Sequence, residues 1–300
     1  MAMIEVERLS KRYGSTLAVD RLDFSIEKGE IVGFLGRNGA GKSTTMRILA
    51  GSLGASEGVA RIGGLDVAGH PRRVKRMVGY LPEVPPLYGD LTVRQYLEYA
   101  ARLKQVVLPR EAAERVVEQV GLKESTGRLI EHLSKGFRQR VGIAQALVHQ
   151  PQVLILDEPV SGLDPVQRHE IIELVKALSE GDTTVVLSTH VLAEIESVCD
   201  RVIIIHGGRI VAQDTVEHLA DGARSVVLRV ARCDDGLLGR LRQVEGITSV
   251  EYRESGEIFI HADTDVRESL ARVAVESGLL ELRPQQRLQD AFLRLIGEVA

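Results

Sequence analysis

The sequence has little that would suit a membrane-spanning, secreted or disulfide-linked protein. Among its 300 residues only two are cysteine, none is tryptophan, and aromatic residues make up 4%. The longest apolar runs, such as residues 153–156 and 202–205, are far too short to cross a lipid bilayer. Residues 1–6 alternate like a strand and lack the apolar run of a signal peptide. We therefore expect neither a membrane span nor a signal sequence.

The net charge and the cysteine spacing further limit the class of protein and its expected partners. The net charge is −4, so no overall basic field points to nucleic acid as a partner. Four basic residues lie within residues 72–76, and a solvated face is favoured over a lipid or nucleic-acid site. Cys199 and Cys233 lack the spacing of metal ligands, which indicates free thiols in a reducing cytosol.

A phosphate-binding loop is the strongest pattern in the chain. Residues 31–35 read as a buried strand and residues 44–50 as a helix, and the turn between them fits G-x-x-x-x-G-K-[ST]. Loop glycines let the N–H groups turn inward, Lys42 can reach the β- and γ-phosphates, and the Ser43 hydroxyl can ligate Mg²⁺. The pattern predicts a nucleotide site formed by Gly36, Arg37, Asn38, Gly39, Ala40, Gly41, Lys42, Ser43 and Thr44.

Two further strands end in residues suited to hydrolysis. Residues 153–156 form an apolar run that ends in Asp157 and Glu158, and residues 184–187 lead to His190. Buried parallel strands of this kind bind ligands at their carboxyl ends. In-line attack on a γ-phosphate needs charge neutralisation and an oriented water. We expect Asp157 to hold Mg²⁺ through waters bound to Ser43, Glu158 to polarise the water, and His190 to reach the γ-phosphate. Solvated acids at a strand end and an ordinary loop histidine are the alternatives.

The remaining patterns predict an α/β protein with a second, smaller domain. Residues 4–9 and 20–27 alternate like antiparallel strands exposed on one face, and residues 92–104 and 110–120 read as helices. After residue 223 the pattern resembles a ferredoxin-like βαββαβ unit with one added helix. Its elements are expected at 225–231, 235–243, 247–253, 256–262, 266–277, 279–283 and 288–296.

With these motifs in this order, residues 1–220 resemble the ATP-binding subunit of an ABC transporter. The positions that match the family's motifs are Tyr13 (the adenine-stacking aromatic), 36–43 (Walker A), 133–137 (signature), 153–158 (Walker B), 161–165 (D-loop) and His190 (switch histidine). In the signature Ser134 and Gly136 are kept, while Lys135 and Phe137 depart from the family pattern. Glu83 stands where the family usually has glutamine, a residue that contacts the metal and the water and senses the membrane partner. A carboxylate can still fill that role.

The resemblance implies a P-loop NTPase core of ABC type with an antiparallel β subdomain and a helical subdomain at about 90–150. It implies a domain of residues 1–220 followed by a C-terminal accessory domain of residues 223–300. It also implies a Mg²⁺-dependent ATPase whose ATP-bound form is a homodimer, with Ser134, Lys135 and Gly136 facing the nucleotide of the second subunit. Residues 83–90, through Leu87 and Tyr88, are expected to receive an integral membrane permease. The chain would then be cytoplasmic and peripheral on the inner face of the cell membrane. Within the family it resembles most the ATPases of bacterial drug and polymer exporters.

Alternatives differ in partner rather than in fold. A soluble ABC ATPase acting on ribosomes or DNA usually carries two cassettes or a long coiled-coil insertion, and we find neither. A regulatory module with vestigial hydrolysis is disfavoured by Glu158 and His190, and a GTPase by the lack of an Asn-Lys-x-Asp motif. The accessory domain's role stays open between dimer brace and ligand sensor. Its last helix carries an apolar stripe that packs on its own sheet or on a second subunit, namely Leu288, Ala291, Phe292, Leu295 and Ile296.

Overall fold

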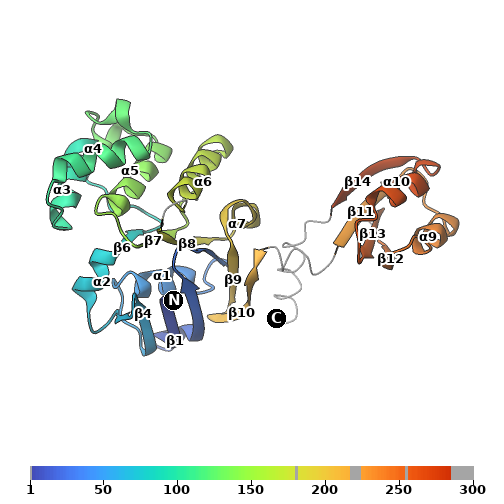
Figure 1. Ribbon diagram of the computed structural model, residues 1–300, viewed down its shortest axis with the longest axis horizontal. Coiled ribbons are helices and arrows are strands. Elements are labelled where there is room, and N and C mark those ends of the chain that lie inside the picture. Colours follow the sequence, from blue (N-terminus) through green and yellow to red (C-terminus); the bar gives the residue numbers. More distant parts are fainter. Residues whose placement is uncertain (1, 180–181, 217–223, 254–255, 285–300) are drawn as a thin grey trace. The chain divides into compact units, whose positions relative to one another are not determined.

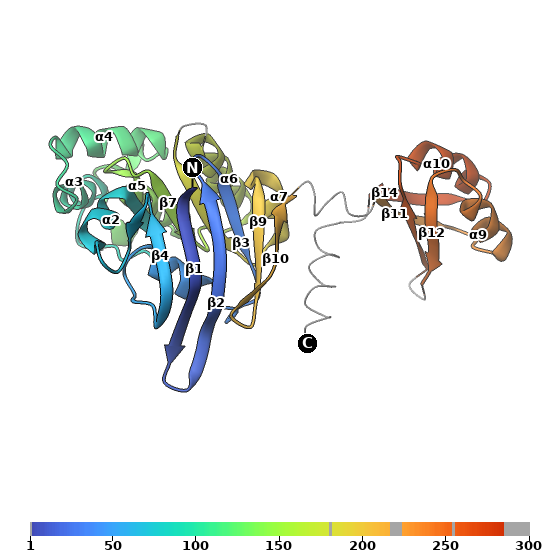
Figure 2. The same ribbon diagram turned by 60° about the horizontal axis from the view of Figure 1, so that its bottom comes forward.

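The computed structural model describes residues 2–179, 182–216, 224–253 and 256–284. The chain divides into two compact units, Met1–Asp214 and Thr215–Ala300, which are treated separately below. Figures 1 and 2 show the strands and helices of each unit from two directions. Within the described ranges, no helix combines the length and the apolar character needed to cross a bilayer.

The first unit begins with an antiparallel sheet. Its strands are β1 (Ala2–Tyr13), β2 (Thr16–Glu27), β4 (Glu57–Ile62) and β5 (Leu65–Asp66), in the order β2-β1-β4-β5. Residues 22–27 alternate buried and exposed, so the prediction of a sheet exposed on one face is confirmed. The strands are longer than predicted, because polar residues at the far ends of β1 and β2 pair with each other beyond the core.

A six-stranded sheet forms the centre of this unit. Its order is β10-β9-β3-β8-β7-β6. The strands are β3 (Ile31–Leu35), β6 (Val78–Leu81), β7 (Val153–Asp157), β8 (Thr184–Thr189), β9 (Arg201–His206) and β10 (Arg209–Thr215). Every residue of β3, β7 and β8 is buried, as their continuous apolar runs predict for parallel strands covered on both faces.

Helix α1 (Lys42–Leu49) fills the space between the two sheets. Its Met46, Ile48 and Leu49 belong to one apolar core together with side chains from both sheets. Helix α7 (Leu192–Val198) packs on β3 and β8 and contacts α6 (Pro165–Ser179). Gly33 lets α7 approach β3 closely, since a Cβ at this position would overlap Ile195 and lie 3.0 Å from the Cys199 sulfur. Cys199 is therefore buried, and burial raises the pKa of its thiol.

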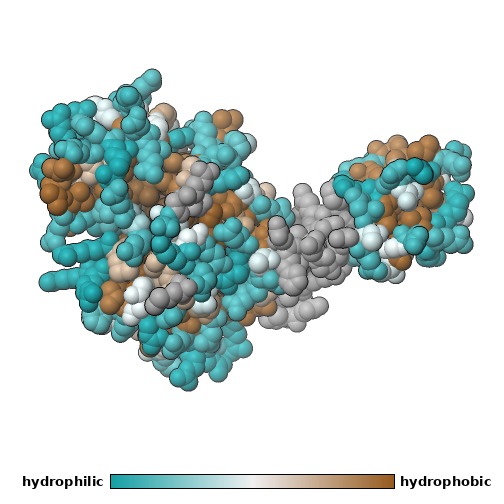
Figure 3. Space-filling view, viewed as in Figure 1, coloured by the Kyte–Doolittle hydropathy of each residue, from teal (hydrophilic) through white to brown (hydrophobic). Residues whose placement is uncertain are grey.

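The helical region consists of α3 (Val93–Leu103), α4 (Pro109–Gln119), α5 (Lys135–Leu147) and the short turns η1 (Lys123–Ser125) and η2 (Ile130–His132). Thr92 caps α3 in a capping box with Gln95, so the helix begins where the pattern at 92–104 predicts. Figure 3 shows apolar surface over α3 and α4, where Leu103, Val107 and Leu108 are exposed.

A half-buried lysine joins the helical region to the central sheet. Lys104 follows α3 directly, and its ammonium donates to the carbonyl oxygens of Lys75 (2.6 Å) and Val78 (3.1 Å). His149 lies against it, with Nε2 3.3 Å from the Lys104 nitrogen. Burial lowers the pKa of Lys104 to about 8 and that of His149 to about 4.

The basic segment at residues 72–76 forms a short helix that the sequence pattern does not predict. Helix α2 (Pro71–Met77) buries one side chain, Val74, and leaves Arg72, Arg73, Lys75 and Arg76 exposed. The interpretation as a solvated face is confirmed. The helix escapes prediction because a single buried position in seven residues gives no periodicity.

In its described ranges the second unit is an antiparallel sheet of order β12-β13-β11-β14 with the helices α9 and α10. Its elements are β11 (Arg224–Val230), α9 (Asp235–Arg242), β12 (Ile247–Tyr252), β13 (Glu257–Ala262), α10 (Arg267–Val275) and β14 (Leu279–Pro284). Leu237 and Leu241 of α9 and Leu270 of α10 pack on the sheet in one apolar core. These elements follow the predicted order. The helix predicted at 288–296, with its apolar stripe, lies outside the described residues.

Candidate nucleotide site

Four neighbouring strands of the central sheet deliver the predicted site residues to one edge. Strands β3, β8, β7 and β6 are adjacent and pair in parallel, so their carboxyl ends lie together. The phosphate loop follows β3, His190 follows β8, Asp157 ends β7 with Glu158 next to it, and Glu83 lies two residues after β6. This edge is where open parallel sheets bind ligands.

Two of the loop glycines are required because the backbone of adjacent strands leaves no room for a Cβ atom, whether or not a ligand is bound. A Cβ at Gly36 would overlap the backbone oxygen of Ile205 in β9. Gly41 has φ 108°, a conformation that favours glycine, and a Cβ there would lie 2.7 Å from the Ala18 oxygen. The backbone of the loop is therefore pressed against two strands, while Arg37, Asn38 and Gly39 are exposed at its tip.

Lys42 lies inside the loop rather than in solvent. Its side chain is 5% exposed and its ammonium donates to the oxygens of Gly36 (2.8 Å) and Arg37 (3.4 Å). The same nitrogen lies 3.2 Å from Oε1 of Glu158. A buried cation is thereby held between the loop carbonyls and the carboxylate that follows β7.

Asp157 receives two hydroxyl groups. Ser43 donates to its Oδ1 at 3.0 Å, and Ser188 of β8 donates to the same atom at 2.5 Å. Burial raises the pKa of Asp157, and the charges of Glu158 and Glu83 add to the rise, whereas the two hydrogen bonds oppose it. Glu83 therefore lies within electrostatic range of Asp157.

Glu158 has a backbone conformation that is rare for a side chain of this size. Its φ is 49°, in the left-handed region, which costs on the order of 1–3 kcal/mol and persists only where the surroundings enforce it. The Glu158 amide donates to the Ser188 oxygen (3.1 Å) and hydroxyl (3.0 Å). This anchoring directs Oε2 to Nδ1 of His190 at 2.8 Å. The structure thus brings Glu158 into direct contact with both Lys42 and His190.

Sequence reasoning does not single out Ser188, although its hydroxyl donates to the Asp157 carboxylate and accepts from the Glu158 amide. Its signal is weak, since a serine at a strand end is common and only the spatial neighbourhood of β7 and β8 reveals its two partners.

The oxygen donors fit a magnesium ion. Ser43 and Asp157 offer hydroxyl and carboxylate oxygens 3.0 Å apart. No group of three or more His, Cys, Asp or Glu side chains in the described ranges could hold a metal ion on its own. Mg²⁺ usually binds one or two protein ligands and completes its octahedron with waters and substrate phosphates, so this sparse donor set suits it.

Tyr13 and the residues at 134–136 belong to other parts of the unit. Tyr13 ends β1, is 43% exposed, and has the Lys11 ammonium 5.4 Å from its ring centre. Ser134 is the N-cap of α5 and accepts a hydrogen bond from the Phe137 amide at 3.4 Å. Lys135 extends toward Gly162, against which its ammonium packs.

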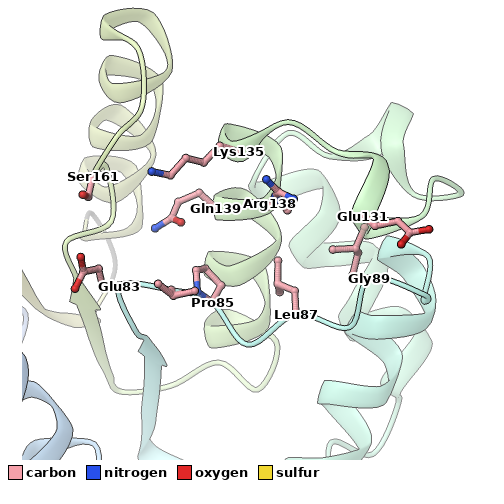
Figure 4. Close-up of a pocket in the computed structure, with 11 residues that line it drawn as sticks. Glu83, Pro85, Leu87, Gly89, Glu131, Lys135, Arg138, Gln139 and Ser161 are labelled. Atoms are coloured by element: carbon pink, nitrogen blue, oxygen red, sulfur yellow. The ribbon is translucent and has the colours of Figure 1, made fainter.

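A pocket of about 440 Å³ opens beside Glu83. Figure 4 shows that its walls come from the loop after β6, the start of α5 and the loop after β7. Lys135 and Gln139 of α5 face Glu83 across it, and Leu87 and Ser161 are among the other residues that line it. Tyr88 packs instead on α3, edge-on to Tyr96 and Tyr99 with ring centres 6.0 and 5.7 Å away.

Comparison with known proteins places these features in a family. Residues 19–161 match the family model described as ABC transporter. The chain is 35% identical to the bacitracin transport ATP-binding protein of Bacillus licheniformis, over 98% of this chain and 97% of that protein. It is 34% identical to the daunorubicin/doxorubicin resistance ATP-binding protein of Streptomyces peucetius, over 99% of this chain and 93% of that protein.

Solved structures share the fold of the first unit. A dimeric bacterial ABC transporter cassette aligns with a TM-score of 0.65 at 26% identity, covering 71% of this chain and 99% of the cassette.

Proposed function

The chain belongs to the ABC transporter family as an ATP-binding ATPase subunit, and we propose that it powers export through a membrane permease by cycles of ATP-driven dimer closure and hydrolysis. The observation that carries the proposal is the contact of Lys42, Glu158 and His190 at the edge where the phosphate loop and Asp157 also lie.

Each group at this edge has a chemical task in phosphoryl transfer. Lys42 and the loop amides neutralise the phosphates, and bound Mg²⁺ would supply charge neutralisation between them. Ser43 and Asp157 would hold that ion, and Glu83 would assist them. Glu158 accepts a proton from the attacking water, and its backbone anchoring to Ser188 fixes the direction of approach. His190, in contact with Glu158, registers the γ-phosphate.

The ATP-bound form is proposed to be a homodimer. Ser134 caps the N-terminus of α5, whose free amides and partial positive charge suit a phosphate. Within this unit that end lies on a different element from the phosphate loop, which agrees with a phosphate supplied by a second copy. Lys135 would add a cation there, and Tyr13 would stack on the adenine. A dimeric cassette among the structural relatives supports this assembly.

The pocket beside Glu83 is proposed to receive a cytoplasmic helix of the permease. It contains apolar side chains, including Leu87, next to charged ones, and it touches both Glu83 and the start of α5. A helix seated there would contact the nucleotide edge and the helical region at once. Because Tyr88 packs on α3, Leu87 is the better anchor of the two predicted contacts.

Export is proposed because one full-length relative is a drug resistance protein. The alternative of a soluble ABC ATPase acting on ribosomes or DNA is not favoured, since relatives that match over nearly the whole chain are named for transport or drug resistance. We accordingly propose a position at the inner face of the cell membrane, held by the permease and without nucleic acid as a partner.

For residues 223–300 we propose an accessory domain of ferredoxin-like type that follows the ATP-binding domain of residues 1–220. The support is the β-α-β-β-α-β order with the central pair β13-β11. Its proposed role is a dimer brace, with ligand sensing as the alternative. A chain ending near Asp221 should be monomeric in ADP while the full chain stays dimeric, as measured by sedimentation. Identical monomers in both cases would contradict the brace.

The main proposal is tested on the purified full chain. We expect phosphate release from ATP that requires Mg²⁺ and rises steeply with protein concentration, because two chains build each site. Hydrolysis without Mg²⁺, or a rate per chain that is independent of concentration across the dimerisation range, would contradict it.

A further inference from the structure

A buried carboxylate beside the nucleotide edge has no task in the mechanism above. Glu194 lies in the first turn of α7, four residues after His190, and its side chain is 4% exposed. Burial raises its pKa, while Thr189 and Arg168 oppose the rise. Burying a carboxylate is costly unless it is paired and hydrogen-bonded, so its partners indicate what it holds in place.

The first partner fixes the turn that carries His190. The Thr189 hydroxyl donates to Oε2 of Glu194 at 2.5 Å and accepts from the Val191 amide at 3.0 Å. His190 is the residue between Thr189 and Val191, so these two hydrogen bonds bracket it. Its own side chain is 48% exposed, and the contact with Glu158 at 2.8 Å depends on how this turn is set.

The second partner comes from α6. Arg168 lies in the first turn of that helix, where its amide donates to the Asp164 oxygen at 2.9 Å, directly after the loop of residues 161–165. Its Nε lies 3.8 Å from Oε1 of Glu194, and this buried nitrogen has no hydrogen-bond partner among the residues that the structure describes. The charge pair therefore links the start of α6 to the His190 turn, at a distance that a small displacement would close to a hydrogen bond.

We propose that Glu194 is a positioning residue that holds His190 against Glu158 through Thr189 and ties this turn to α6 through Arg168. The inference rests on the proposed role of His190 in hydrolysis. Glu194 touches neither nucleotide nor water in this scheme. Loss of the hydrogen bond between Glu194 and Thr189 lets the turn move and misplaces the His190 imidazole. A displacement of about 1 Å can lower the rate on the order of 100-fold.

The test separates positioning from general stability. Glu194→Ala should lower kcat by about 10- to 100-fold and leave KM for ATP within about twofold, because the phosphate loop is untouched. Thr189→Val should do the same. Glu194→Gln keeps an oxygen that accepts from Thr189 and should retain most of the turnover. Glu196→Ala, the same change at an exposed position of the same helix, is the matched control and should leave kcat unchanged.

A double-mutant cycle with His190→Ala provides the decisive readout. In that background Glu194→Ala should cause no further loss, since residues that act as a unit are not additive. Equal losses in both backgrounds, or wild-type turnover of Glu194→Ala, would overturn the inference. Wild-type turnover of His190→Ala would instead refute the proposed role of His190, and a fall in Glu194→Ala alone would then show that Glu194 acts by another route. Should Glu194→Ala fail to fold, Thr189→Val carries the same cycle with His190→Ala.

Discussion

Replacing Glu158 with glutamine should stop turnover and leave nucleotide binding intact. Glutamine has the shape of glutamate, and the backbone anchors to Ser188 at 3.0 and 3.1 Å do not involve the side chain, so the geometry is retained. The lost group is the base. A general base contributes about 10²- to 10⁴-fold, so kcat should fall at least about 100-fold, which equals about 2.7 kcal/mol of activation free energy.

The same variant should also change stability, because Glu158 pairs with buried Lys42 at 3.2 Å. Removing one partner of a buried pair costs about 3–5 kcal/mol when the other charge is left alone. Lys42 keeps the Gly36 oxygen at 2.8 Å, so we expect a loss below that range. Phosphates would replace the missing carboxylate, and ATP should therefore raise the melting temperature more in Glu158→Gln than in the unaltered chain.

Three measurements check this prediction: phosphate release at saturating ATP, equilibrium titration with ATP, and sedimentation with Mg²⁺ and ATP, where a stable dimer should accumulate. Glu196→Gln, an exposed carboxylate changed in the same way, is the control and should behave like the unaltered chain. Turnover within about threefold of the unaltered rate would refute the assignment of Glu158 as base. A tenfold loss of ATP affinity with unchanged kcat would make it a binding residue instead.

Three further outcomes are expected. Lys42→Ala should weaken ATP binding itself in a nucleotide titration, because its ammonium is the buried cation of the loop, and unchanged affinity would count against the phosphate-loop assignment. Leu87→Asp should spare the ATPase activity of the isolated chain but prevent capture by the cognate permease in a pull-down, and undiminished capture would place docking elsewhere. His149 has a folded pKa of about 4 against 6.5 for the free group, so the unfolded chain binds more protons between these values and stability falls as pH drops from 6.5 to 4. In urea unfolding at pH 7 and pH 5, the free energy of unfolding of His149→Gln should fall less between the two pH values than that of the unaltered chain. An identical fall in both chains would contradict this expectation.

Local patterns predict the strands that carry the site because those strands are buried on both faces. The apolar runs before Gly36 and Asp157 predict buried parallel strands. The residues that follow such strands lie together at the carboxyl-terminal edge of the sheet. The juxtaposition of Lys42, Glu158 and His190 follows from this rule and from the order of the strands.

Contacts that depend on side-chain direction could not be predicted. The bond from Ser188 to Asp157 needs β7 and β8 in register, and the packing of Tyr88 on Tyr96 and Tyr99 needs α3 in place. Glu194 looks like a surface acid of an amphipathic helix, and only the closeness of α6 reveals a buried charge. The positive φ of Glu158 has no signature at all, since glutamate rarely adopts it.

The packing of Gly33 against α7 has a practical consequence for probes of this molecule. Because Cys199 is sealed beneath that helix with its thiolate disfavoured, Cys233 is the one remaining thiol of the chain and is only half-buried. Burial and the charges of Asp234 and Asp235 raise the pKa of Cys233, so its alkylation should accelerate as the solution becomes more alkaline. A maleimide dye would then mark the second unit at a single native position, and energy transfer between two labelled chains would follow that unit through the ATP cycle without any engineered cysteine.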